Sequence, residues 1–208
     1  PFGGGIGAAE HHSESTEALF AHTPGVKVVV PSGPHDAKGL LLAAIEDPDP
    51  VVFFEPIRVY RAIKEEVPDG EYRVPIGAAA IVRQGSDATL IGYGAVVADL
   101  RRAAEELSER GRDVEVVDVR TISPLDADTI VESVRRTGRA VVVTESHRTA
   151  GMASEIAALV QERALYSLLA PVERVTGWDT VVPLKRSEEY YIPDVARIVA
   201  AVERTLEA

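Results

Sequence analysis

The sequence predicts an α/β fold with a mainly parallel sheet, in which a partial first domain is followed by a complete second one. Short apolar runs alternate with amphipathic, helix-like stretches along most of the 208 residues. The apolar runs are continuous, which is typical of strands that are covered on both faces. We place the first domain at residues 1–66, a polar linker at 67–77 and the second domain at 78–208.

The first domain begins with a glycine-rich turn, Gly3 to Gly7, whose residues can take positive φ and let the backbone approach a ligand closely. A helix is expected to follow and to end at Thr23. Ser13 or Ser15 can cap this helix, with Glu17 completing a capping box. The residues expected to form its buried face are Ala18, Leu19 and Phe20.

Two buried strands are predicted next, over residues 26–30 and 51–55, with a helix between them from Asp36. Such a unit predicts a parallel pair with a right-handed crossover. Two strands hold too little core to fold alone, and the chain starts at Pro1 rather than at a methionine. We therefore expect this chain to be a fragment of a longer protein.

The second domain repeats the alternation of strands and helices. Strands are expected over residues 79–83, 89–93, 114–119, 140–144 and 172–176. Helices are expected over residues 96–110, 126–136, 152–164 and 194–206. This order predicts an open, mainly parallel sheet.

Composition excludes several classes of function. A net charge of −11 argues against a nucleic-acid groove or an anionic membrane surface as partner. No apolar run approaches the roughly 18 to 20 residues of a membrane span. The absence of cysteine excludes disulfides and thiolate metal sites, and a reducing cytoplasm is the simplest setting.

Two adjacent histidines, His11 and His12, are the first candidates for chemistry. They stand where the glycine-rich turn meets the helix start, and the partial positive charge there favours a neutral imidazole that can accept a proton near pH 7. The alternative is a pair of surface or loop histidines without a chemical role, and spacing alone favours that alternative.

Residues just after the predicted strands are further candidates, because open parallel sheets bind ligands at the carboxyl ends of their strands. They are Glu55, Arg120, Glu145 with the three residues that follow it, and Asp179. Each also has a structural explanation, such as an ion pair between Arg120 and Asp126 or a loop cap by Asp179.

Ala44, Asp47 and Asp49 form a different kind of candidate at a helix C-terminus. Unpaired carbonyls and nearby carboxylates are the oxygen ligands that hard cations take. A solvated acidic turn is the commoner explanation of such a cluster.

Several stretches resemble one enzyme family. Residues 11–56, beginning HHSESTEALFAH, and then RVYRA and EEVPDGEYRVPIG closely resemble the β subunit of thiamine-dependent 2-oxo acid dehydrogenases. DVRTISPLD, VVVTESHRTAGMASEI and RVTGWDTVVP are similar to the transketolase-type carboxy-terminal domain of that family. The resemblance implies a partial pyrimidine-binding domain followed by a transketolase carboxy-terminal-type domain.

The same resemblance implies residue roles and partners. His12 matches the histidine associated with acyl transfer to lipoyl-lysine, and Ala44, Asp47 and Asp49 match a structural potassium site. The glutamate that activates the cofactor should lie upstream of this chain, so no cofactor-binding residue is assigned. The implied cofactors are thiamine diphosphate and Mg²⁺, held by an α subunit. The implied assembly is an α2β2 heterotetramer with a lipoyl-bearing transacylase core.

The substrate is less sharply indicated. FFEP and VYRA look like the branched-chain enzymes, whereas EVPDGEYRVPIG is similar to bacterial pyruvate enzymes. We expect branched-chain 2-oxo acids. The alternatives are a pyruvate or acetoin dehydrogenase β subunit and a catalytically inert assembly fragment, and the isolated chain is expected to show no turnover.

Overall fold

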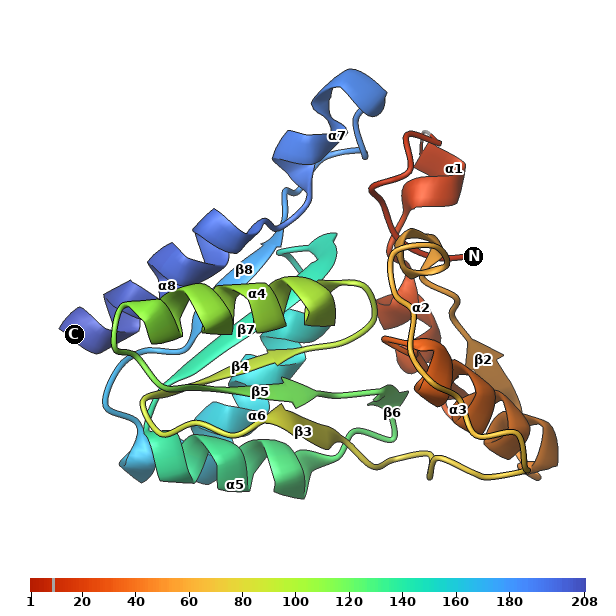
Figure 1. Cartoon of the computed structure of the whole chain (residues 1–208), viewed down its shortest axis with the longest axis horizontal. Coiled ribbons are helices and arrows are strands. Elements are labelled where there is room, and N and C mark those ends of the chain that lie inside the picture. Colours follow the sequence, from red (N-terminus) through yellow and green to blue (C-terminus); the bar gives the residue numbers. More distant parts are fainter. Residues whose placement is uncertain (9) are drawn as a thin grey trace.

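The chain forms two β-sheets in the computed structural model, which describes residues 1–8 and 10–208 but not the side chains of Glu10 and His11 (Figure 1). The smaller sheet has the strand order β2-β1-β6 and the larger one the order β3-β5-β4-β7-β8. In the larger sheet β5, β4, β7 and β8 run parallel, and β3 is antiparallel to β5. The predicted α/β class with a mainly parallel sheet is confirmed.

The smaller sheet is built from the predicted strand–helix–strand unit and one strand that was not predicted. β1 (Lys27–Val29) pairs in parallel with β2 (Val51–Phe53), and α3 (Pro34–Glu46) connects them. β6 (Thr121–Ser123) pairs antiparallel with β1 although it is far away in the sequence. The second half of the chain therefore contributes to the sheet of the first half.

The larger sheet consists of strands at nearly the predicted positions. Their bounds are β3 Ala80–Arg83, β4 Ala88–Gly92, β5 Val114–Asp118, β7 Ala140–His147 and β8 Glu173–Gly177. β4 and β5 are buried along their whole length. Burial on both faces explains why their sequences are continuous apolar runs.

Helices cover both faces of the larger sheet (Figure 1). α4 (Val96–Glu109) and α8 (Val195–Glu207) pack together on one face. α5 (Ala127–Thr137) and α6 (Met152–Ala164) cover the other face. The larger sheet is therefore the middle layer of a three-layer arrangement.

The predicted helix after the glycine-rich turn is wrong in its extent and in its buried face. It is replaced by two short helices, α1 (Glu10–Ser13) and α2 (Glu17–Ala21). Thr16 stands at the N-cap of α2 without a side-chain cap bond, so the capping box is also wrong. Leu19 is 71% exposed and Phe20 is 41% exposed, whereas Glu17 is fully buried.

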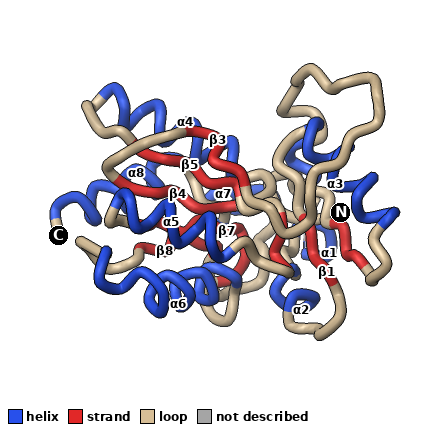
Figure 2. The backbone as a smooth tube through the Cα atoms, turned by 90° about the horizontal axis from the view of Figure 1, so that it is seen from below, coloured by secondary structure: helices blue, strands red, loops and turns tan. Residues whose placement is uncertain are grey.

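Three further short elements complete the chain: η1 (Ile57–Val59), η2 (Leu165–Ser167) and α7 (Lys185–Tyr191). Figure 2 shows the elements α1 to α3 and β1 gathered at one end of the molecule and the larger sheet at the other. One apolar cluster contains residues of both, for example Val28 and Phe54 together with Ile91 and Val142. Within the described residues, no helix combines the length and the apolar character that a membrane crossing needs.

Candidate active site

The glycine-rich turn is held in a conformation that other residues rarely adopt. Gly3, Gly5 and Gly7 have φ angles of 85°, 90° and 69°. Positive φ is readily available only to glycine, because a Cβ would crowd the following carbonyl. The Gly3 N–H donates to the Glu14 carbonyl at 3.2 Å, which closes the chain into a loop around α1.

Two carboxylates from the second half of the chain accept hydrogen bonds from the backbone N–H groups of this turn. The Gly4 N–H donates to Glu145 Oε2 at 3.0 Å. The Gly5 and Gly7 N–H groups donate to Glu188 Oε1 and Oε2 at 2.8 Å and 2.7 Å. Converging amides of this kind form an anion-binding concavity. The turn was expected to approach a ligand closely, but in this structure it approaches two side chains of its own chain.

His12 lies on α1, directly beyond this anchored turn. Its side chain is exposed, whereas the next residue, Ser13, is only 1% exposed. The helix is therefore fixed on one side and presents His12 on the other. The side chain of His11 lies outside the described part of the structure.

A buried pair beneath α1 and α2 joins Glu17 to Tyr93. The Tyr93 hydroxyl donates to Glu17 Oε1, and both side chains are buried. Burial raises the pKa of Glu17, and burial together with the Glu17 carboxylate raises the pKa of Tyr93 well above its usual range. Ser13 Oγ and Glu17 Oε2 are buried without a hydrogen-bond partner among the described residues, so this layer has capacity for bound water.

An ion-pair network lies next to that pair. Arg58, on η1, donates to Glu145 Oε1 at 2.6 Å and to Asp99 Oδ2 at 3.0 Å. Burial raises the pKa of Glu145, and the Arg58 guanidinium opposes this rise. Burial and the nearby Glu145 carboxylate raise the pKa of Tyr191 to about 12. The segment around His12 therefore rests on a buried polar layer.

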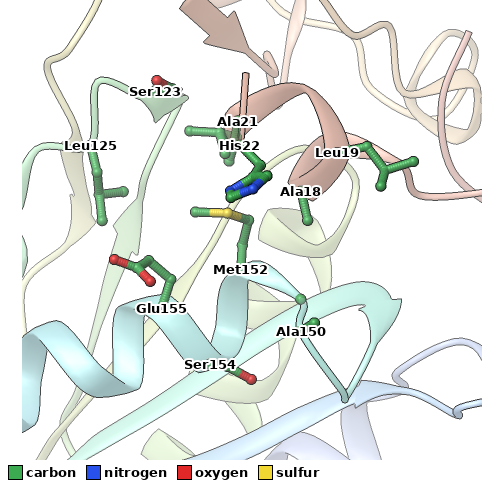
Figure 3. Close-up of a pocket in the computed structure, with 12 residues that line it drawn as sticks. Ala18, Leu19, Ala21, His22, Ser123, Leu125, Ala150, Met152, Ser154 and Glu155 are labelled. Carbon is green, nitrogen blue, oxygen red and sulfur yellow. The ribbon is translucent and has the colours of Figure 1, made fainter. Parts of the chain in front are cut away.

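A cavity of about 760 Å³ lies between α2 and the start of α6 (Figure 3). The His22 ring and the Met152 side chain point toward one another in it, and Glu155 lies on the α6 side. The residues that line this cavity include His22, Met152 and Glu155 but not His12. The exposed His12 and this cavity are thus separate features.

Family models match most of the chain. The transketolase pyrimidine-binding domain matches residues 1–62, and the transketolase C-terminal domain matches residues 77–198. The chain belongs to the transketolase family. Among solved structures, a chain titled "Split gene transketolase, inactive beta4 tetramer" has a TM-score of 0.79 and 27% identity. That match covers 94% of this chain and 62% of the other.

Within the transketolase family the chain is similar to curated proteins over its whole length. It is 50% identical over 208 residues to the pyruvate dehydrogenase E1 component subunit beta of Acholeplasma laidlawii. It is 48% identical over 207 residues to the corresponding protein of Staphylococcus epidermidis. The chain spans 64% of the length of each of these relatives. Both relatives are named as pyruvate dehydrogenase subunits.

The predicted cation ligands of this transketolase-family chain lie beside a lysine. Lys27 Nζ lies 2.7 Å from Asp47 Oδ1 and 3.1 Å from Asp49 Oδ2. The hydrogen bond from Lys27 lowers the pKa of Asp47. Ala44 lies in the last turn of α3, where carbonyls lack intrahelical partners. One ammonium beside two carboxylates leaves a net charge of about −1 at this helix end. Potassium binding stays a prediction.

The strand-end candidates mostly serve the structure. Arg120 pairs with Asp36 at 2.7 Å, not with Asp126. Asp126 instead caps α5 by accepting the Thr129 N–H at 3.1 Å. Asp179 accepts the Thr149 N–H at 2.9 Å and so ties two loops together. Of the predicted strand-end residues, Glu145 is the one that reaches the turn before His12.

Among the residues of this site that the sequence analysis missed are Arg58 and Glu188. Arg58 stands on η1 and Glu188 on α7, two short elements that were not predicted. A signal was available for Glu188, because Tyr191 at the end of α7 and Ile192 directly after it are an aromatic and an apolar residue, and both are buried.

Proposed function

We propose that this chain forms part of the β subunit of a thiamine diphosphate-dependent 2-oxo acid dehydrogenase that acts on pyruvate. The observation that carries the proposal is 50% identity, over all 208 residues, to a protein named as that subunit. The proposal extends to an α subunit, an α2β2 heterotetramer and a lipoyl-bearing transacylase core as partners. The pyruvate reading replaces the branched-chain one, since the relatives carry pyruvate in their names.

Thiamine diphosphate, when bound, supplies the carbon nucleophile that decarboxylates a 2-oxo acid. The backbone amides of the glycine-rich turn do not fit its diphosphate, because Glu145 and Glu188 already accept their hydrogen bonds. We therefore assign the diphosphate and Mg²⁺ to the α subunit, in keeping with the resemblance.

His12 is the residue of this chain that we assign to chemistry. Opening the dithiolane ring of lipoyl-lysine leaves a sulfur that must be protonated, and an imidazole can supply that proton near neutral pH. The His12 side chain is exposed, so a lipoyl group arriving from another protein can reach it. Its backbone is anchored by the turn before it.

The test is His12→Ala in the assembled complex. Acyl transfer to lipoyl-lysine should fall by roughly 10²- to 10⁴-fold, the range typical of a general acid or base, while decarboxylation with an artificial electron acceptor is retained. His11→Ala is the neighbouring control and should do much less. Equal losses in both assays would assign His12 to cofactor or substrate positioning, and no loss in either would make it a surface histidine.

A second candidate function is assembly without catalysis by the chain alone. The observation that favours it is the structural similarity to a chain whose title describes an inactive β4 tetramer. The purified 208-residue chain should then show no turnover with pyruvate, thiamine diphosphate and Mg²⁺. Measured turnover by this chain would refute that expectation.

A further inference from the structure

Glu188 makes the most specific contact between the second half of the chain and the glycine-rich turn. Both of its carboxylate oxygens accept backbone N–H groups, from Gly5 at 2.8 Å and from Gly7 at 2.7 Å. The residue is 5% exposed, so these hydrogen bonds are largely removed from water. Hydrogen bonds to an ionised, desolvated acceptor are among the strong ones in proteins.

The turn has no spare room at this contact. A Cβ on Gly7 would lie 2.8 Å from Lys185 Cδ, and a Cβ on Gly5 would lie 2.6 Å from Arg58 Cδ. Both glycines also have positive φ. The backbone can thus reach the carboxylate only because side chains are missing at these positions.

The contact lies close to His12 in the chain. Gly7 stands three residues before α1, the four-residue helix that carries His12. Glu188 stands on α7, a helix of seven residues that projects from the larger sheet beside α1 (Figure 1). The His12 segment is therefore tied to an element 183 residues away from Gly5 in the sequence.

We propose that Glu188 is a positioning residue for His12 and acts through the amides of Gly5 and Gly7. This inference rests on the proposed role of His12 in acyl transfer. Glu188 touches neither substrate nor cofactor in this account. It sets the direction in which α1 leaves the turn, and with it the place where the imidazole meets the lipoyl group.

The decisive variant is Glu188→Gln, with Glu189→Gln as the matched control on the exposed side of the same helix. Glutamine keeps the size of the side chain but turns one acceptor oxygen into a donor that faces an N–H group. In the assembled complex, hydrogen exchange of the Gly5 and Gly7 amides should speed up about tenfold or more in Glu188→Gln and stay unchanged in Glu189→Gln.

In the assembled complex, the ratio of acyl transfer to decarboxylation should fall about tenfold for Glu188→Gln, with KM for pyruvate unchanged. Glu188→Asp, which keeps the charge, should recover part of this loss. Gly7→Ala attacks the same contact from the other side, should lower the same ratio, and keeps the proposal testable if Glu188→Gln folds poorly.

The outcomes separate the two proposals. Faster exchange with an unchanged ratio would overturn the link from Glu188 to His12, and unchanged exchange would overturn the anchoring itself. If His12→Ala impairs acyl transfer while Glu188→Gln and Gly7→Ala do not, only the positioning role fails. If His12→Ala has no effect, the proposed role of His12 fails and the positioning role falls with it.

Discussion

The Arg58 guanidinium lies 2.6 Å from the Glu145 carboxylate, so the segment that follows β2 is bound to the end of β7. The same guanidinium lies 3.0 Å from Asp99 on α4. The side chains of Glu145 and Asp99 are only 5% and 4% exposed. Arg58 therefore bridges two buried carboxylates, and Arg102 also pairs with Asp99.

Replacing Arg58 by alanine should strongly destabilise the protein. The change leaves the buried Glu145 without its cation and Asp99 with Arg102 alone. Breaking a buried ion pair from one side costs about 3–5 kcal/mol. Part of this loss will be recovered because burial already raises the pKa of Glu145, which allows the carboxyl to take up a proton. Urea unfolding should show a lower midpoint.

Arg61→Ala is the matched control, since Arg61 is exposed three residues further along the chain. Its effect on the free energy of unfolding should stay within about 0.5 kcal/mol. Equal unfolding midpoints for the two variants would show that the buried network contributes nothing beyond a surface arginine.

The raised pKa of Asp118 predicts that the stability of the protein depends on pH. It ends β5, accepts the Arg120 N–H at 3.1 Å, and burial raises its pKa from 3.8 to about 7. The folded state thus holds this proton more tightly than the unfolded state does. The contribution of Asp118 to the free energy of unfolding is fully present below pH ~4 and is lost as the pH rises to ~7. This loss is at most about 4 kcal/mol.

Asp118→Asn should remove this loss, because the amide stays neutral and can still accept the Arg120 N–H. The variant should therefore gain stability relative to the wild type between pH 5 and pH 8 in urea unfolding. Asp69→Asn, an exposed aspartate in the linker, should leave the pH dependence unchanged. A wild type and an Asp118→Asn variant with parallel pH profiles would contradict the raised pKa.

The elements of the larger sheet were predictable because their signals are local. β4 was expected at residues 89–93 and is found at Ala88–Gly92, and α6 lies where it was expected, at Met152–Ala164. A strand buried on both faces needs an apolar run, and an amphipathic helix needs periodic apolar residues. Both requirements can be read from a short window of sequence.

The burial of Glu17 could not be read in that way. The pattern around it suggested that Leu19 and Phe20 face the core, but these side chains are exposed and Glu17 is buried against Tyr93. That contact joins residues 76 positions apart, so no local pattern contains it. The resemblance to known enzymes brought attention to His12, while the contacts that hold its segment are visible only in the folded chain.

Gly39 should resist substitution although it lies inside α3. Alanine normally stabilises a helix interior by about 1 kcal/mol relative to glycine. At Gly39 a Cβ would lie 2.5 Å from Val74 Cγ2 and 3.0 Å from the Val74 backbone nitrogen, where the linker crosses the helix. Gly39→Ala should therefore lower stability by about 1–2 kcal/mol, as overpacking does.

Gly70→Ala provides the comparison for Gly39, because a Cβ at Gly70 meets nothing within 4 Å. Its unfolding midpoint should stay close to that of the wild type. A Gly39→Ala variant as stable as Gly70→Ala would mean that the linker does not pack on α3 in solution.

Lys27 contacts two of the residues predicted to bind potassium, and this contact determines how the site can be tested. Its ammonium contacts both Asp47 and Asp49, and the Asp47 side chain is only 13% exposed. An ion that binds these carboxylates in the native state stabilises that state by mass action. Because Lys27 already neutralises one of the two charges, a potassium ion must share the carboxylates with it.

Lys27→Met should therefore make the protein more sensitive to potassium. The melting temperature should be higher in potassium chloride than in tetramethylammonium chloride at equal ionic strength, and this difference should be larger in Lys27→Met than in the wild type. Lys64→Met, which removes an exposed lysine just before the linker, is the control and should keep the wild-type difference. If the two salts give the same melting temperature for both the wild type and Lys27→Met, then Asp47 and Asp49 form an acidic turn that needs only Lys27, and the potassium assignment is wrong. If the difference exists in Lys27→Met alone, the lysine itself takes the place of the ion in the native chain.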